Sequence, residues 1–162
     1  MGQAVNNGAE AVRATETIKS RIDAAKASVR RSGRVLILIS DADRNVYAAK
    51  PESYPGAVAG MINLENLAKG LPDSGPYPGF ALFTGEQAVT GKPDVIFTIS
   101  PAPAPAPRLS DMLGKIPGFA DLDAVKAGRV REISPTLFLQ AQGPRIAEAA
   151  EEMGRLMTEI LP

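Results

Sequence analysis

Apolar and small side chains recur at intervals of three and four residues through the first part of the chain, from Ala9 to Arg31. Charged residues occupy most of the positions between them. This spacing places the apolar residues on one face of an α-helix. The pattern therefore predicts one long amphipathic helix that ends at Ser32-Gly33. Its apolar or small positions are Val12, Thr15, Ile18, Ile22, Ala25 and Val29.

A continuous apolar run follows directly. Residues 35–39 read VLILI, between Arg34 and Ser40. A run that is apolar at every position is typical of a strand covered on both faces in a parallel sheet. Two later segments predict further strands: 93–100 (PDVIFTIS), and 128–134 (GRVREIS), whose more polar sequence favours a place nearer an edge.

Helical patterns separate these strands, at 86–90, 109–113, 122–127 and 145–161. Strands that alternate with helices indicate an α/β fold. The predicted fold is a three-layer α/β/α sandwich with a mainly parallel sheet, preceded by the long helix. The last helical segment has the clearest apolar stripe, formed by Ile146, Ala149, Ala150, Met153, Met157 and Ile160.

Composition excludes several functions. The 162 residues include 18 Lys and Arg against 18 Asp and Glu, and no basic run exceeds Arg30-Arg31. We therefore expect no nucleic-acid partner and no attraction to an anionic membrane surface. The chain has no Cys and no His, which excludes thiolate and imidazole catalysis and the usual transition-metal sites. Binding is favoured over catalysis, with no cofactor and no metal-ligating residue assigned; an enzyme that uses only carboxylates and tyrosine is the remaining catalytic alternative.

Two segments resemble functional sites, a phosphate loop and a carboxylate cluster, but neither is interpreted as one. Residues 85–93 (GEQAVTGKP) have the two glycines and the lysine of a phosphate loop, but five residues separate the glycines and Pro93 replaces the required Ser or Thr. Glu148, Glu151 and Glu152 form a cluster that helical spacing places on the solvated face, where Arg155 can pair with Glu151 or Glu152.

A proline-rich segment, residues 101–107 (PAPAPAP), follows the second predicted strand. Alternating proline removes backbone donors and fixes φ, so we expect a stiff loop rather than a helix or strand. A docking site for a proline-reading domain is the alternative.

Ligands of open α/β sheets lie beyond the carboxyl ends of the strands. The loops 41–47, 101–108 and 135–142 follow predicted strands, and 71–79 is rich in turn residues. Arginines can bind carboxylates there, and tyrosines can pack on flat rings. The candidate ligand-binding residues are Arg44, Tyr47, Tyr77, Arg108 and Gln140.

Arg145 lies at the start of the last predicted helix, where the helix dipole disfavours a positive charge. We favour a structural explanation, in which Arg145 pairs with Glu148 one turn later or bonds to carbonyl groups of a neighbouring loop. The alternative is that Arg145 faces an anionic ligand.

The order of these segments resembles the class III substrate-binding proteins of ABC importers, which carry iron-siderophores, haem or cobalamin. Such proteins have two α/β lobes joined by one long helix. The resemblance implies that residues 1–32 are the interdomain helix, that 33–162 are the carboxyl-terminal lobe, and that the amino-terminal lobe is missing. The segments that carry it are the helix 9–31, RVLILIS (34–40), NLENLAKGLPD (63–73), GEQAVTGKPDVIFTIS (85–100), DAVKAGRVREIS (123–134) and GPRIAEAAEEMGRLM (143–157).

The resemblance also implies the partners: a metal chelate or macrocycle as ligand, and an ABC permease. Members usually dock the permease through an acid on an early helix, but the matching segment 53–61 (SYPGAVAGM) has none, and Glu52 is the nearest substitute. The implied location is periplasmic or otherwise extracytoplasmic for the full-length protein, although residues 1–31 contain no apolar core of an export signal. The alternative function is a self-associating, non-catalytic interaction module that dimerises through the helix 9–31.

Overall fold

The computed structural model describes residues 2–74, 77–140 and 143–161; the predicted loops 71–79 and 135–142 each include two residues outside these ranges. Within these ranges, none of the helices combines the length and the hydropathy of a membrane-spanning segment. The helices are α1 (Gly2–Ser28), α2 (Tyr54–Met61), α3 (Gly85–Gly91), α4 (Leu109–Met112), α5 (Asp123–Lys126) and α6 (Ile146–Ile160), with a 3₁₀ turn at Leu113–Lys115 and a π-helical turn at Thr136–Gln140. The strands are β1 (Arg34–Ser40), β2 (Val46–Ala49), β3 (Glu65–Asn66), β4 (Phe80–Leu82), β5 (Val95–Ile99) and β6 (Val130–Glu132).

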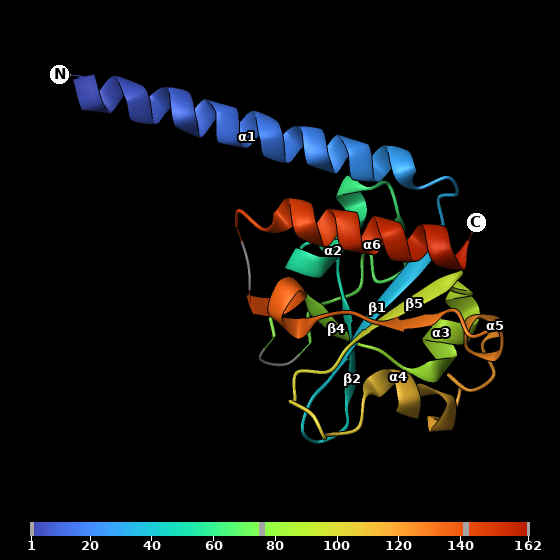
Figure 1. The fold of residues 1–162 in the computed structure, drawn as a ribbon. Coiled ribbons are helices and arrows are strands. Elements are labelled where there is room, and N and C mark those ends of the chain that lie inside the picture. Colours follow the sequence, from blue (N-terminus) through green and yellow to red (C-terminus); the bar gives the residue numbers. More distant parts are fainter. Residues whose placement is uncertain (1, 75–76, 141–142, 162) are drawn as a thin grey trace.

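The sheet has the order β4-β2-β1-β5-β6, with β3 paired to β1 (Figure 1). β1, β3, β5 and β6 run parallel, so the predicted mainly parallel sheet is confirmed. β2 pairs antiparallel with β1 and with β4, and the sequence pattern predicted neither β2 nor β4. The predicted loop 41–47 is therefore partly wrong, because β2 begins at Val46 and Tyr47 lies on that strand. The four residues of β2 are too few to give a periodic signal.

The two faces of the sheet bury separate cores. Val35 and Ile37 of β1 pack with α2 and α6 on one face, whereas Leu36 and Leu38 pack with α3, α4 and α5 on the other. All four side chains are completely buried. Because adjacent strand residues point to opposite faces, the VLILI run requires a helical layer on each side, and the predicted three-layer sandwich is confirmed (Figure 1).

Among the residues of α1 whose burial is described, those in its carboxyl-terminal half dock on the lobe. Ala25 is buried against α6, where a Cβ added at Gly154 would lie 3.2 Å from the Ala25 carbonyl oxygen. Arg21 donates two hydrogen bonds to Glu151, at 2.7 and 2.6 Å. Residues 8–17 are exposed, and α1 extends past the lobe in Figure 1. Most of the predicted apolar stripe before Ile22 is therefore uncovered in this chain.

The ion pairs on α6 agree only in part with those predicted from the sequence. Arg145 donates to Glu148 at 2.8 and 2.9 Å, which confirms the structural explanation of this arginine. Arg155 pairs with Glu152 at 2.9 Å and with Glu159. Glu151 pairs with Arg21 on α1 instead, because α1 packs along this side of α6.

Candidate ligand-binding site

A cavity of about 700 Å³ opens beyond the carboxyl ends of β1 and β5. Its walls come from the ends of these strands, the β1–β2 turn, β2, β4, the proline-rich segment, α4 and the π-helical turn. The sheet edge where parallel strands end is the usual ligand position in open α/β folds. The lining residues are Ile39, Ser40, Asp41, Ala42, Arg44, Tyr47, Tyr77, Phe80, Ser100, Pro101, Ala102, Pro107, Met112 and Leu139.

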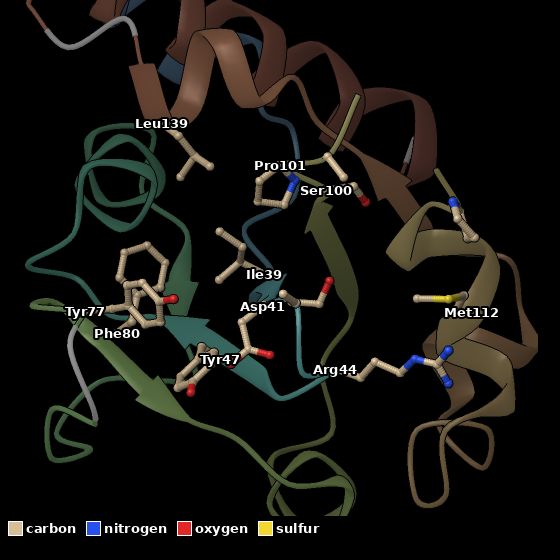
Figure 2. Close-up of a pocket in the computed structure, with 14 residues that line it drawn as sticks. Ile39, Asp41, Arg44, Tyr47, Tyr77, Phe80, Ser100, Pro101, Met112 and Leu139 are labelled. Carbon is tan, nitrogen blue, oxygen red and sulfur yellow. The ribbon is translucent and has the colours of Figure 1, made fainter. Parts of the chain in front are cut away.

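Aromatic side chains gather at one end of this cavity. The rings of Tyr47 and Tyr77 meet edge to face, with centroids 5.3 Å apart and planes at 73°. Phe80 lies beside Tyr77, and Arg44 and Met112 lie across the cavity from them (Figure 2). Aromatic and aliphatic walls favour a ligand with a large apolar surface.

The β1–β2 turn brings Arg44 to the cavity. The Asp41 carboxylate accepts hydrogen bonds from the backbone and the side-chain amide of Asn45, at 2.8 and 3.0 Å. Arg44 takes a left-handed conformation, with φ of 65°. Non-glycine residues adopt this conformation at a cost and only where the surroundings enforce it. The braced turn holds the Arg44 backbone in place, and its side chain extends toward Met112 (Figure 2).

Tyr47 and Asp41 interact inside the cavity. Tyr47 is 9% exposed, and its burial, together with a hydrogen bond to the nearby Asp41 carboxylate, raises the pKa of the phenol above its ordinary value. The hydrogen bond from the Asn45 side chain is the main cause that lowers the pKa of Asp41. At neutral pH the site therefore holds a neutral Tyr47 hydroxyl beside an ionised carboxylate.

Asp41→Asn should lower the pKa of Tyr47 toward its ordinary value of 10.0. The substitution keeps the shape of the side chain but removes the negative charge that opposes phenolate formation. Part of the upward shift should remain, because burial is its largest cause. The Tyr47 ring signals, followed by NMR from about pH 8 to about pH 12, measure the change. Asp43→Asn is the control and should have a smaller effect; an unchanged Tyr47 pKa in Asp41→Asn would contradict this account.

Three of the five candidate residues line the cavity: Arg44, Tyr47 and Tyr77. Arg108 lies outside the lining, and its guanidinium donates to the carbonyl oxygens of Ser100 and Ala102, at 3.4 and 3.0 Å. It thereby braces the proline-rich segment, which forms neither helix nor strand. Gln140 is exposed at the end of the π-helical turn.

Sequence reasoning missed the apolar lining residues and also the polar residues Ser40, Asp41 and Ser100. Ile39, Phe80, Met112 and Leu139 were not among the candidates, because an apolar residue near the end of an element looks like part of the core. The position of Ile39 at the end of the first apolar strand was the available signal.

Glu52 is exposed, just before α2, and lies 3.8 Å from the Lys50 ammonium group. It does not line the cavity. Lys50 also bonds to Asp73 at 2.5 Å. Across residues 2–74, 77–140 and 143–161 there is no group of three or more acidic side chains that could hold a metal ion.

Comparisons with known proteins identify the family. No curated protein matches the chain. An ABC transporter substrate-binding protein from Listeria monocytogenes EGD-e has a TM-score of 0.73 and 23% identity, covering 91% of this chain and 56% of that one. The periplasmic heme-binding protein RhuT from Roseiflexus sp. RS-1 has a TM-score of 0.73 and 20% identity, covering 98% and 59%. A structure of the ABC-type Fe³⁺-hydroxamate transport system from Saccharomonospora viridis DSM 43017 has a TM-score of 0.70 and 16% identity, covering 90% of this chain and 48% of that one.

These structures share the fold, and the chain spans about half to three-fifths of their lengths. A family model described as periplasmic binding protein matches residues 1–137. A match over most of the sequence, together with a cavity at the carboxyl edge of a three-layer α/β sheet, shows that the chain belongs to the periplasmic binding protein family.

Proposed function

We propose that this chain forms one wall of the ligand cleft in the substrate-binding component of an ABC importer. The ligand is a metal chelate or macrocycle: an iron-siderophore, a haem or a cobalamin. The observation that carries the proposal is the cavity itself, which has aromatic rings at one end and Arg44 at the other. Two similar structures, a periplasmic heme-binding protein and an ABC-type Fe³⁺-hydroxamate transport system, support this class of ligand.

A second lobe would complete the cleft. The chain spans 59% of the heme-binding protein RhuT, and residues 8–17 of α1 are exposed in a helix that would pack against both lobes. We therefore infer that an amino-terminal lobe covers this part of α1 and supplies the opposite wall. Such a protein works outside the cytoplasm, binds rather than transforms its ligand, and delivers it to a permease. Glu52 is the proposed permease contact on this lobe.

Titration of the isolated chain with haemin, a ferric hydroxamate siderophore and cobalamin tests the proposal. Absorbance and calorimetry both follow binding in a chain that has no tryptophan. One of the three should bind detectably but weaker than about 1 μM, because half of the contacts are absent. Submicromolar affinity would contradict a two-lobed site, and no binding by any of the three would contradict the ligand class.

A self-associating module is the second candidate function. The exposed residues 8–17 of α1, including Val12 at 57% exposure, favour it. An apolar helical stripe without cover promotes dimers or an exchange of helices between two copies. Light scattering over a range of concentrations separates the candidates: a growing dimer fraction supports self-association, and a monomer at every concentration rejects it.

A further inference from the structure

A second, smaller cavity of about 280 Å³ adjoins the first. The two cavities share Ser40, Arg44 and Met112 in their walls. The remaining walls of the smaller one are Val46, Leu109, Lys115 and Ile116. It lies at the end of the main cavity opposite the aromatic rings, on the side of Arg44 and Met112 (Figure 2).

The smaller cavity is apolar apart from one serine and two cations. Among the described residues, the side chains of Arg44 and Lys115 have no hydrogen bond or ion pair. The acidic residue in the wall of the main cavity is Asp41, and its carboxylate accepts hydrogen bonds from Asn45 and Tyr47. By contrast, Arg108 is occupied by two backbone carbonyls. Two cations without a carboxylate partner therefore border one apolar recess.

We propose that this side cavity receives a short alkyl arm of the ligand that ends in a carboxylate. Arg44 and Lys115 supply charge-assisted hydrogen bonds to the carboxylate, and Val46, Leu109, Met112 and Ile116 contact the alkyl part of the arm. The inference rests on the proposed function for the rest of the ligand, whose flat body lies against Tyr47, Tyr77 and Phe80. Arg44 lines both cavities. Binding of the carboxylate to Arg44 therefore fixes the orientation of the flat body of the ligand in the main cavity.

The charge of the ligand then becomes a criterion for selection. A neutral ligand of the same shape would leave both cations without a partner and would lose their hydrogen bonds. We expect a carboxylate ligand to bind about tenfold tighter than its neutral counterpart. The advantage should shrink as the salt concentration rises, because Lys115 and Arg44 are exposed to solvent.

A pair of matched probes tests this selection on the whole chain. 1-Pyrenebutyrate has a flat aromatic body and an alkyl arm that ends in a carboxylate, and 1-pyrenebutanol has the same body and arm with a neutral hydroxyl. Fluorescence titration gives both affinities, and NMR shifts of the labelled chain locate each probe. Both should perturb Tyr47 and Tyr77, and the butyrate alone should also perturb Lys115. Lys115→Met should reduce the preference for the butyrate, whereas Lys69→Met, which removes an exposed lysine outside both cavities, should leave it unchanged.

Each outcome decides the inference. Equal affinity of the wild-type chain for both probes would overturn the carboxylate arm but leave the aromatic wall in place. An equal loss of preference in Lys115→Met and Lys69→Met would also overturn it, because general charge attraction would then explain the difference. Failure of both probes to bind would overturn the arm and the proposed aromatic wall together.

Discussion

Gly56→Ala should destabilise the protein by about 3 kcal/mol or more. A Cβ added at Gly56 would lie 1.9 Å from the carbonyl oxygen of Lys50 and 3.0 Å from the Cα of Pro51. These are backbone atoms, so no rotation of a side chain relieves the overlap. The first turn of α2 or the segment before it has to move, and α2 packs against the buried face of the sheet through Val58 and Ala59. Urea unfolding followed by circular dichroism measures the loss.

Gly60→Ala, in the same helix, is the matched control. No atom lies within 4 Å of a Cβ added there. Alanine is the better helix former, so this change should stabilise the protein by about 0.5 to 1 kcal/mol. The two alanine substitutions should therefore have opposite signs. Similar effects of both would show that α2 does not approach Lys50 as closely as described.

Phe138→Ala should destabilise the protein by about 3 to 5 kcal/mol. Phe138 is completely buried in the core that α2 and α6 share, and it belongs to the π-helical turn Thr136–Gln140. Removal of the ring leaves a cavity among close-packed neighbours that relax only in part. Thermal or urea unfolding measures the change.

Leu139→Ala is the companion variant. Leu139 is half-buried and points into the ligand cavity (Figure 2). The substitution should lower the free energy of unfolding by less than about 2 kcal/mol. It should nevertheless weaken the binding of 1-pyrenebutanol, because it removes part of the apolar wall. Phe138 thus supports the fold and Leu139 the site. A stability loss in Leu139→Ala equal to that in Phe138→Ala would contradict this division.

Long or continuous apolar patterns predicted the fold well. The VLILI run predicted a buried strand, and the apolar stripe of α6 predicted its buried face. Both elements are long enough for their apolar pattern to be recognised. The shorter strands were not predicted from the sequence. β3 has two residues and β4 has three, and their pairing depends on the rest of the sheet rather than on their own sequence.

The candidate site was predicted through one arginine and two tyrosines of its lining. The rule that ligands lie at the carboxyl edge brought Arg44, Tyr47 and Tyr77 together. Arg108 follows a strand in the same way, but its guanidinium is turned to nearby carbonyls, and no sequence pattern distinguishes the two orientations. The pairing of Glu151 with Arg21 likewise spans 130 residues, so only the packing of α1 on α6 determines it.

Paramagnetic NMR with haemin tests most directly whether the cavity is a ligand wall. The ferric iron broadens nearby amide signals, and gallium protoporphyrin, which is diamagnetic, controls for simple contact. The account predicts broadening centred on residues 39–42, Tyr47 and residues 100–102, with none at residues 8–17 of α1. Broadening centred on another face of the chain would contradict it.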